Sequence, residues 1–146
     1  MTTNTIRLHR VLRTTPNRIY QAFLTPAALA KWLPPNGYTC TVDHMEAKVG
    51  GKYHAAFTDI GTGHSHSFGG DYLELHPGER LRYSAVFDDP GLPGTMETTV
   101  TLKQVSCGTE MHIEQAGVPA AIPAEQCYLG WQQSLVLLAL LVEDAA

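Results

Sequence analysis

The pattern of apolar and polar positions predicts one strand, two short helices, six further strands and a long final helix, in that order. Residues 5–12 alternate between apolar and polar side chains, as a half-buried strand does. Thr15 and Thr25 are each followed by a proline, which is typical of an N-cap residue and the first position of a helix. The segment 34–37, with two prolines, an asparagine and a glycine, ends the second helix.

The middle of the chain is expected to form a continuous antiparallel meander. Apolar runs of strand length recur there, separated by turns rich in glycine and proline. Some of them alternate as a sheet with one buried face should, for example Tyr53, Ala55 and Phe57. The predicted strands are residues 38–45, 52–58, 67–76, 80–87, 96–105 and 110–115.

The last part of the chain, from Pro123 onward, is rich in helix formers. One apolar stripe at helical spacing predicts a helix that packs across the sheet. Its members are Tyr128, Trp131, Leu135, Leu138 and Val142. Further apolar residues lie off this stripe and predict a second contact, with a ligand, the short helices or another subunit. These residues are Leu129, Val136, Leu137, Leu140 and Leu141.

Two glycine positions inside predicted elements need an explanation. Gly69 and Gly70 interrupt a strand, which indicates a kink or the close approach of another backbone. Gly130 lies in mid-helix, where glycine costs about 1 kcal/mol relative to alanine. We expect close contact between helix and sheet to compensate at Gly130, and the alternative is a helix defect without compensation.

The composition is that of a globular protein, and we expect a single domain spanning residues 1–146. Apolar residues make up 44% of the chain and charged residues 16%, which excludes the composition of a disordered protein. The net charge is −4 and the basic residues are scattered, so we expect no nucleic-acid partner.

The cysteines and the apolar runs bear on the cellular compartment. Cys40, Cys107 and Cys127 are odd in number and widely spaced, which fits neither a disulfide framework nor a metal site. We interpret them as free thiols in a reducing compartment. Residues 1–10 lack an apolar signal core, and the apolar run 135–142 is too short to span a bilayer. We therefore expect a cytoplasmic protein without a membrane span.

A set of short motifs extends over nearly the whole chain. It comprises residues 16–23, Pro26 with Trp32, residues 50–53, 68–75, 77–81 and 108–111, and Gly130 with Trp131 and Leu135. In these motifs and in the order of its elements, the chain resembles the START-like superfamily, which includes birch-pollen-allergen-type proteins and polyketide cyclases. More closely, it resembles the family named after the C-terminal domain of the activator of the heat-shock-protein ATPase.

The resemblance implies an α+β helix-grip fold: a curved antiparallel sheet of about seven strands, two short helices after the first strand, and a long C-terminal helix packed across the sheet. It also implies a cavity, and no particular reaction. We expect the cavity to bind a small hydrophobic or amphipathic ligand without a cofactor, because aromatic side chains suit such a lining. The predicted lining residues are Tyr53, Phe57, Phe68, Tyr72, Tyr83, Tyr128, Trp131 and Leu135.

Two other functions stay open. An enzyme of the polyketide cyclase or small hydrolase kind would pair His54 or His112 with Glu74 or Glu114 inside the cavity for acid–base catalysis. The other possibility is an interaction module, linked to a chaperone or forming a homodimer through the last helix.

Other chemistry is not indicated by the sequence. The two imidazoles of the segment 64–66, His-Ser-His, would share one face of a strand and suit a metal ion. Their position after a glycine-rich turn indicates a hairpin tip instead, and further ligands are not apparent. No Gly-x-Ser-x-Gly turn is present. We therefore assign no catalytic residue and no metal ligand.

Overall fold

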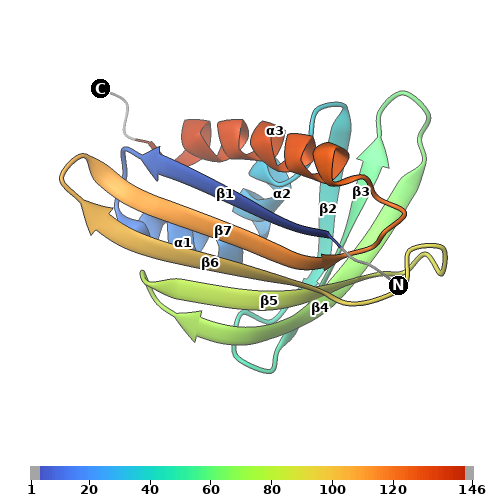
Figure 1. Cartoon of the computed structure of the whole chain (residues 1–146), viewed down its shortest axis with the longest axis horizontal. Helices are drawn as coiled ribbons and strands as arrows, with labels where there is room; N and C mark the ends of the chain where they lie inside the picture. The colour runs from blue at the N-terminus through green and yellow to red at the C-terminus, as the bar shows by residue number, and fades with distance from the viewer. Residues whose placement is uncertain (1–3, 144–146) are drawn as a thin grey trace.

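The structure, a computed structural model, describes residues 4–143, in which seven strands form one antiparallel sheet and three helices pack on it (Figure 1). The elements in chain order are β1 (Asn4–Leu12), α1 (Pro16–Leu24), α2 (Pro26–Trp32), β2 (Tyr38–Met45), β3 (Lys52–Asp59), β4 (Ser65–His76), β5 (Arg80–Phe87), β6 (Met96–Val105), β7 (Gly108–Val118) and α3 (Ala124–Val142).

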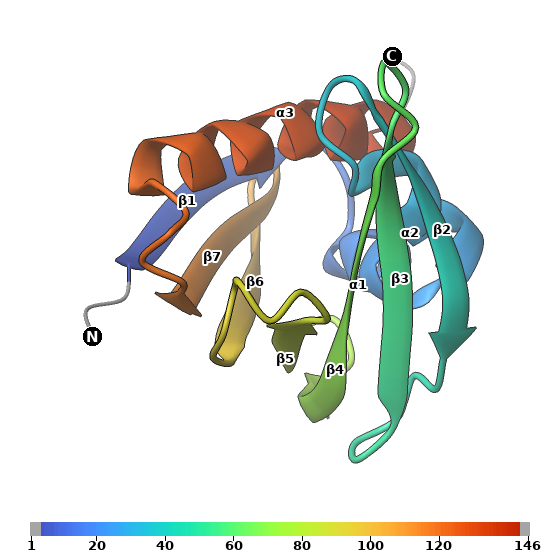
Figure 2. The same ribbon diagram turned by 90° about the vertical axis from the view of Figure 1, so that its right-hand side faces the viewer.

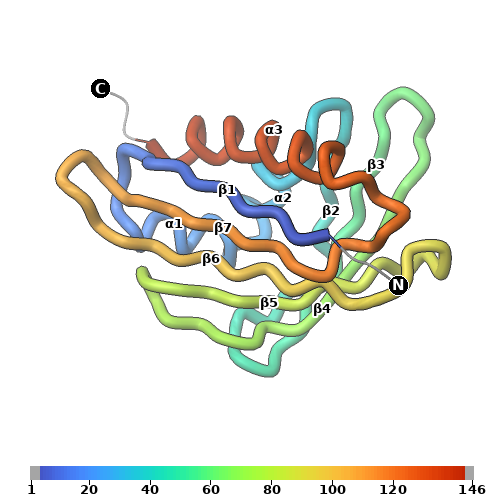
Figure 3. Tube along the Cα trace, viewed as in Figure 1, coloured from blue at the N-terminus to red at the C-terminus, as the bar shows by residue number. Residues whose placement is uncertain are grey.

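The strand order in the sheet is β1-β7-β6-β5-β4-β3-β2. After β1 the chain forms α1 and α2 and continues into β2 at the opposite edge of the sheet. From there it returns strand by strand until β7 pairs with β1, as the trace in Figure 3 shows. The predicted α+β helix-grip fold is thus confirmed. The predicted last strand was too short at both ends, since β7 spans Gly108–Val118.

The sheet curves strongly, and α3 runs across its open, concave side (Figure 2). Directly paired residues of antiparallel strands share a face, so the register assigns strand side chains to the concave or the convex face. Leu8 pairs with Ile113 and is buried on the concave face beneath α3. The next pair, His9 and His112, lies on the convex face, where both side chains are exposed.

The two short helices close one end of the concave groove. Helix α2 packs against β2 and α3, and α1 packs against α2, α3 and β6. Fully buried Trp32 holds the two helices together: its indole N–H donates to the carbonyl oxygen of Ala22 at 2.9 Å, and its ring meets that of Phe23 edge-on. The threonine–proline prediction is confirmed at Thr15, whose hydroxyl accepts a hydrogen bond from the N–H of Arg18.

The main hydrophobic core lies between these helices, α3 and strands β1, β5, β6 and β7. Its fully or almost fully buried members include Ile19, Trp32, Leu81, Val100, Met111, Ile113 and Leu138. The concave groove is therefore filled by close-packed side chains at the end that α1 and α2 close.

Helix α3 buries most of its predicted stripe, namely Trp131, Leu135, Leu138 and Val142. Tyr128 departs from the prediction because it lies at the exposed edge of the helix, and Ser134 is buried instead. The hydroxyl of Ser134 donates to the carbonyl oxygen of Leu33 at 2.6 Å, which ties α3 to the end of α2. Farther along, the carboxylate of Glu143 accepts a hydrogen bond from the backbone N–H of Arg13 at 2.9 Å.

The close approach predicted at Gly69 and Gly70 is confirmed. A Cβ atom on Gly69 would lie 2.6 Å from the carbonyl oxygen of Tyr53 on β3. A Cβ atom on Gly70 would collide with the carbonyl group of Ser84 on β5. The strand β4 thus fits between its two neighbours here only because it carries no side chain.

Among the described residues, no helix combines the length and the apolar character needed to cross a membrane. The predicted domain of residues 1–146 includes positions 1–3 and 144–146, which lie outside the described residues.

Two leucines of α3, two positions apart, test how the helix is held. Leu138 is 0% exposed and Leu140 is 77% exposed. We expect Leu138→Ala to lower the free energy of unfolding by about 2–5 kcal/mol, because it removes a buried side chain and leaves a cavity. Leu140→Ala, the matched control, should change it by about 0.5 kcal/mol or less. Urea unfolding monitored by circular dichroism measures both, and equal losses would contradict this packing of α3.

Candidate ligand-binding cavity

A cavity of about 200 Å³ lies under the N-terminal half of α3, next to the solid core. Its walls come from the sheet, from α3, from α1 and α2, and from the chain leading into α3. The lining residues are Phe23, Leu29, Leu33, Pro35, Tyr53, Phe57, Phe68, Tyr72, Tyr83, Ala85, Phe87, Met96, Gln115, Val118, Ile122, Gln126, Cys127, Gly130, Trp131 and Ser134.

Six aromatic side chains from β3, β4 and β5 form the sheet side of the cavity. They are Tyr53, Phe57, Phe68, Tyr72, Tyr83 and Phe87. Their rings contact one another at an angle, with centroids 5.0 Å apart for Phe57 and Phe68 and 5.9 Å apart for Tyr53 and Tyr83. Such contacts between rings add stability beyond that gained by burying their apolar area. The wall is therefore almost entirely apolar.

Gln115 of β7 is the main polar side chain of the cavity. Its amide oxygen accepts hydrogen bonds from the indole N–H of Trp131 at 2.9 Å and from the thiol of Cys127 at 3.4 Å. Its amide nitrogen donates to the hydroxyl of Thr98 at 3.1 Å. This network joins α3 to the sheet, and it gives hydrogen-bond partners to polar groups that would otherwise be unpaired beside the cavity.

The three tyrosines of the wall differ in what their hydroxyl groups contact. Tyr53 donates to the carbonyl oxygen of Ser84 at 2.7 Å, and Tyr83 lies beside Thr98, its register partner on β6. Tyr72 hydrogen-bonds no other described residue through its hydroxyl group. Burial raises the pKa of Tyr72 to about 12 and also raises the pKa of Tyr53 and Tyr83. All three phenols therefore stay protonated at neutral pH.

The described residues that line the cavity carry no charged side chain. Burial raises the pKa of the Cys127 thiol, so it is neutral and donates to Gln115. Ser134 is occupied by the carbonyl oxygens of Leu33 and Gly130. The polar groups of the cavity are thus neutral, and most of them are already hydrogen-bonded.

The structure places six of the eight predicted lining residues around the cavity. These are Tyr53, Phe57, Phe68, Tyr72, Tyr83 and Trp131. Two are placed elsewhere: Leu135 packs in the solid core one helical turn beyond Trp131, and Tyr128 points away at the edge of α3. Sequence reasoning missed Gln115, although its place in the apolar alternation of β7 marks it as facing inward.

Gly130 was expected to mark a close contact between helix and sheet, and this expectation is wrong. A Cβ atom on Gly130 would meet nothing within 4 Å, and the residue lines the cavity. It shares the inner face of α3 with Cys127, Trp131 and Ser134. The missing side chain therefore enlarges the cavity and does not bring two backbones together.

The histidine–glutamate pair required for an enzyme does not line the cavity. His54, Glu74, His112 and Glu114 all lie on the convex face of the sheet. Glu114 pairs with Arg7 at 3.0 Å, and Glu74 lies near three basic side chains of the same face. The enzyme hypothesis built on these four residues is therefore wrong. His64 lies in the turn between β3 and β4, as the prediction of a hairpin tip requires, whereas His66 is already on β4, where it pairs with Phe57. Both side chains are exposed.

His54 lies between two carboxylates on the convex face. Its Nε2 lies 2.7 Å from Asp88 Oδ2 and its Nδ1 lies 2.8 Å from Asp43 Oδ1. Ser67 donates to the same Asp88 oxygen at 2.6 Å, so its hydroxyl contacts a carboxylate and not the imidazole. This excludes the serine–histidine contact of a nucleophilic triad. The hydrogen bonds that His54 donates to Asp88 and Asp43 raise the pKa of the imidazole.

A family model described as "Activator of Hsp90 ATPase homolog 1-like protein" matches residues 13–143. The chain belongs to this family. No match was found among curated proteins. Comparisons for this member of the Activator of Hsp90 ATPase homolog 1-like family therefore come from solved structures.

The crystal structure of protein CV1439 from Chromobacterium violaceum is 60% identical to this family member, with a TM-score of 0.96 over 97% of this chain and 99% of that chain. A protein from Rhodobacter sphaeroides is 22% identical, with a TM-score of 0.84 over 96% and 92% of the two chains. An AHSA1-like protein from Aeromonas hydrophila is 20% identical, with a TM-score of 0.74 over 93% and 90%. The last two comparisons show the shared fold alone.

The His54 cluster makes the stability of this family member depend on pH. Below the ordinary pKa of 6.5, His54 is protonated in the folded and the unfolded chain, and its pairing with both carboxylates stabilises the fold in full. As the pH rises through the raised pKa of the folded state, the proton leaves and this stabilisation is lost. His54→Gln should therefore lower the free energy of unfolding clearly at about pH 5.5 and much less at about pH 8.5.

Urea unfolding at both pH values measures this difference, and the exposed His64 provides the control variant His64→Gln. Hydrogen bonds also lower the pKa of the Asp43 and Asp88 carboxyl groups. The contribution of these two carboxylates to the free energy of unfolding is therefore present at both pH values and is lost only in more acidic solution. A loss from His54→Gln that is equal at both pH values would show that the imidazole is not paired as described.

Proposed function

We propose that this chain binds one small, uncharged and mainly apolar molecule in the cavity under α3. The observation that carries the proposal is the lining itself: eight aromatic residues, aliphatic side chains and no charged group among the described lining residues. Moving a charge into such surroundings without a partner is costly, whereas an apolar ring gains by leaving water. The lining therefore favours neutral ligands over ionised ones.

The volume and the free polar groups narrow the class of ligand further. A protein cavity of about 150 Å³ takes up benzene, so about 200 Å³ suits one or two fused rings or an aliphatic molecule of that size. The Tyr72 hydroxyl, which hydrogen-bonds no other described residue, is the group best placed to meet one polar atom of the ligand. We propose that Tyr53, Phe57, Phe68, Tyr83 and Trp131 supply the apolar contacts.

This proposal describes a binding domain that spans residues 1–146 and acts in the cytoplasm. The three cysteines support the compartment, because all of them are free thiols. Cys40, on β2, is partly buried, and burial raises its pKa to about 11, which leaves it neutral and unreactive. The family match supports the fold and leaves the ligand to be found.

Substitutions at Gly130 test the site without removing a contact. Gly130→Leu fills the cavity from α3, and Gly130→Ala adds only a methyl group. Both should raise the melting temperature of the free protein, because glycine costs about 1 kcal/mol in mid-helix. Naphthylmethanol, a neutral bicyclic probe, should raise the melting temperature of the wild type and of Gly130→Ala by mass action, but not that of Gly130→Leu.

Naphthoate has the same ring system with a carboxylate and serves as the matched probe. We expect it to bind the wild type at least tenfold more weakly than naphthylmethanol, as followed by quenching of tryptophan fluorescence. Equal binding of naphthylmethanol to the wild type and to Gly130→Leu would place the probe elsewhere on the protein and contradict the proposal.

A second candidate function is association through the outer face of α3. Leu129, Val136 and Leu140 are 54%, 62% and 77% exposed, which leaves an apolar strip on the surface of the helix. Such a strip suits a second copy of the chain. It also suits a chaperone as partner, because the matched family is named after an activator of the Hsp90 ATPase.

The homodimer is tested by sedimentation of the wild type and of a variant with both Val136→Glu and Leu140→Glu. We expect the wild type to sediment as a dimer at high concentration and the variant as a monomer, because two facing carboxylates in an apolar contact are costly. Neither position is buried, so the variant should keep the fold. A wild type that stays monomeric at all concentrations contradicts the homodimer.

A further inference from the structure

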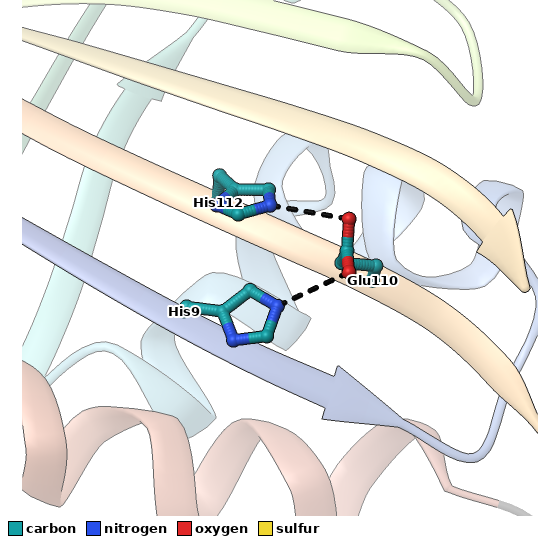
Figure 4. Close-up of side chains that lie close together, drawn as sticks. All are labelled: His9, Glu110 and His112. Carbon is teal, nitrogen blue, oxygen red and sulfur yellow. Dashed lines mark hydrogen bonds and ion pairs between the residues drawn. The ribbon is translucent and has the colours of Figure 1, made fainter.

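A cluster of three metal-ligating side chains lies on the convex face of the sheet, away from the cavity (Figure 4). His9 of β1 and His112 of β7 are direct cross-strand partners, and Glu110 lies on β7 two residues before His112, on the same face. The two imidazole rings have their centroids 4.5 Å apart. Within the described chain, no other three histidine, cysteine or carboxylate side chains bring their ligating atoms within 4.8 Å of one another.

Both imidazoles point the same nitrogen toward one carboxylate. His9 Nε2 lies 3.3 Å from Glu110 Oε2, and His112 Nε2 lies 3.2 Å from Glu110 Oε1. The side chains of His9 and His112 are 50% and 57% exposed, whereas that of Glu110 is 34% exposed. The carboxylate is thus the inner member of the cluster, and the two rings are free to adjust around it and are open to water.

The chemistry of this donor set selects a class of ion. Two imidazole nitrogens and one carboxylate oxygen suit Zn²⁺ and its first-row neighbours, whereas Mg²⁺ and Ca²⁺ prefer oxygen ligands alone. In a tetrahedral zinc site with bonds of about 2.0–2.1 Å, ligand atoms lie roughly 3.3 Å apart. The present separations of up to 4.8 Å close to that value by small rotations of exposed side chains.

We propose that His9, Glu110 and His112 form a binding site for one divalent first-row transition-metal ion, with Zn²⁺ as the reference ion. The protein supplies three ligands, and water completes the coordination on the exposed side. Because His9 is on the edge strand β1 and the other two ligands are on β7, the bound ion connects these strands. It adds to the Arg7–Glu114 ion pair, which joins the same strands at 3.0 Å.

Calorimetric titration of zinc chloride into the full chain, free of any purification tag, tests the proposal at about pH 7.5, where the ion competes well with protons for imidazole nitrogen. We expect one ion per chain and a higher melting temperature with zinc. His9→Gln and His112→Gln should each weaken binding at least tenfold, since even the loss of outer-shell partners costs 10–100-fold in metal sites.

His76→Gln is the matched control. His76 also lies two residues from a glutamate of its own strand, Glu74, at 3.6 Å, but it belongs to no such set of three ligands. Zinc binding to this variant should equal that of the wild type. Absence of zinc binding in the wild type would overturn the proposal, and so would wild-type affinity in both His9→Gln and His112→Gln, because the ion would then sit at other groups such as the free thiols.

A measurement on the wild type alone keeps the test independent of how the variants fold. In a zinc titration followed by NMR, the imidazole resonances of His9 and His112 should shift together and saturate at one equivalent, while that of His76 should stay in place. Equal shifts of all three rings would show unspecific binding and overturn the proposal.

Discussion

The packing of a single long helix over a strongly curved sheet controls the rest of the structure. At its C-terminal half, α3 rests on side chains that α1 and α2 press against the sheet, and Leu135, Leu138 and Val142 complete a close-packed core. At its N-terminal half, α3 lies over aromatic rings of the strands and encloses the cavity. The short helices thus determine which part of the groove is filled, and Gln115 joins helix and sheet beside the hollow part.

The alternation of side chains along the strands separates two kinds of chemistry. Inward positions carry aromatic and aliphatic groups, with neutral hydroxyl, amide and thiol groups that mostly satisfy one another. Outward positions carry the histidine–carboxylate contacts, including those of His54 and His112. The ion pairs between strands therefore lie on the convex face, where water screens them and where titration affects how the strands are held together.

Much of the fold could be predicted from the sequence because periodicity and turn residues report local structure directly. The strands β2, β5 and β6 match their predicted bounds, and Pro16 and Pro26 mark the starts of α1 and α2. The site was harder to predict. Whether an inward side chain lines a cavity or fills the core depends on which side chains face it from the other elements. Leu135 and Trp131 belong to the same apolar stripe, yet Leu135 packs in the core and Trp131 lines the cavity. The role of Gly130 could not be predicted for a similar reason: the sequence does not distinguish a glycine at a close backbone contact from a glycine beside a cavity.

The pairing of β1 with β7 has a consequence for synthesis. Asn4 and Val118 are register partners, so β1 stays unpaired on this side until β7 has been synthesised. Before then, β6 is an open edge, and the concave face has no long helix to cover its aromatic rings. Closing so large a loop is entropically slow, so the sheet is completed and α3 docks only after β7 and α3 have both been synthesised. The nascent chain therefore exposes the aromatic rings of its concave face before the finished protein encloses them.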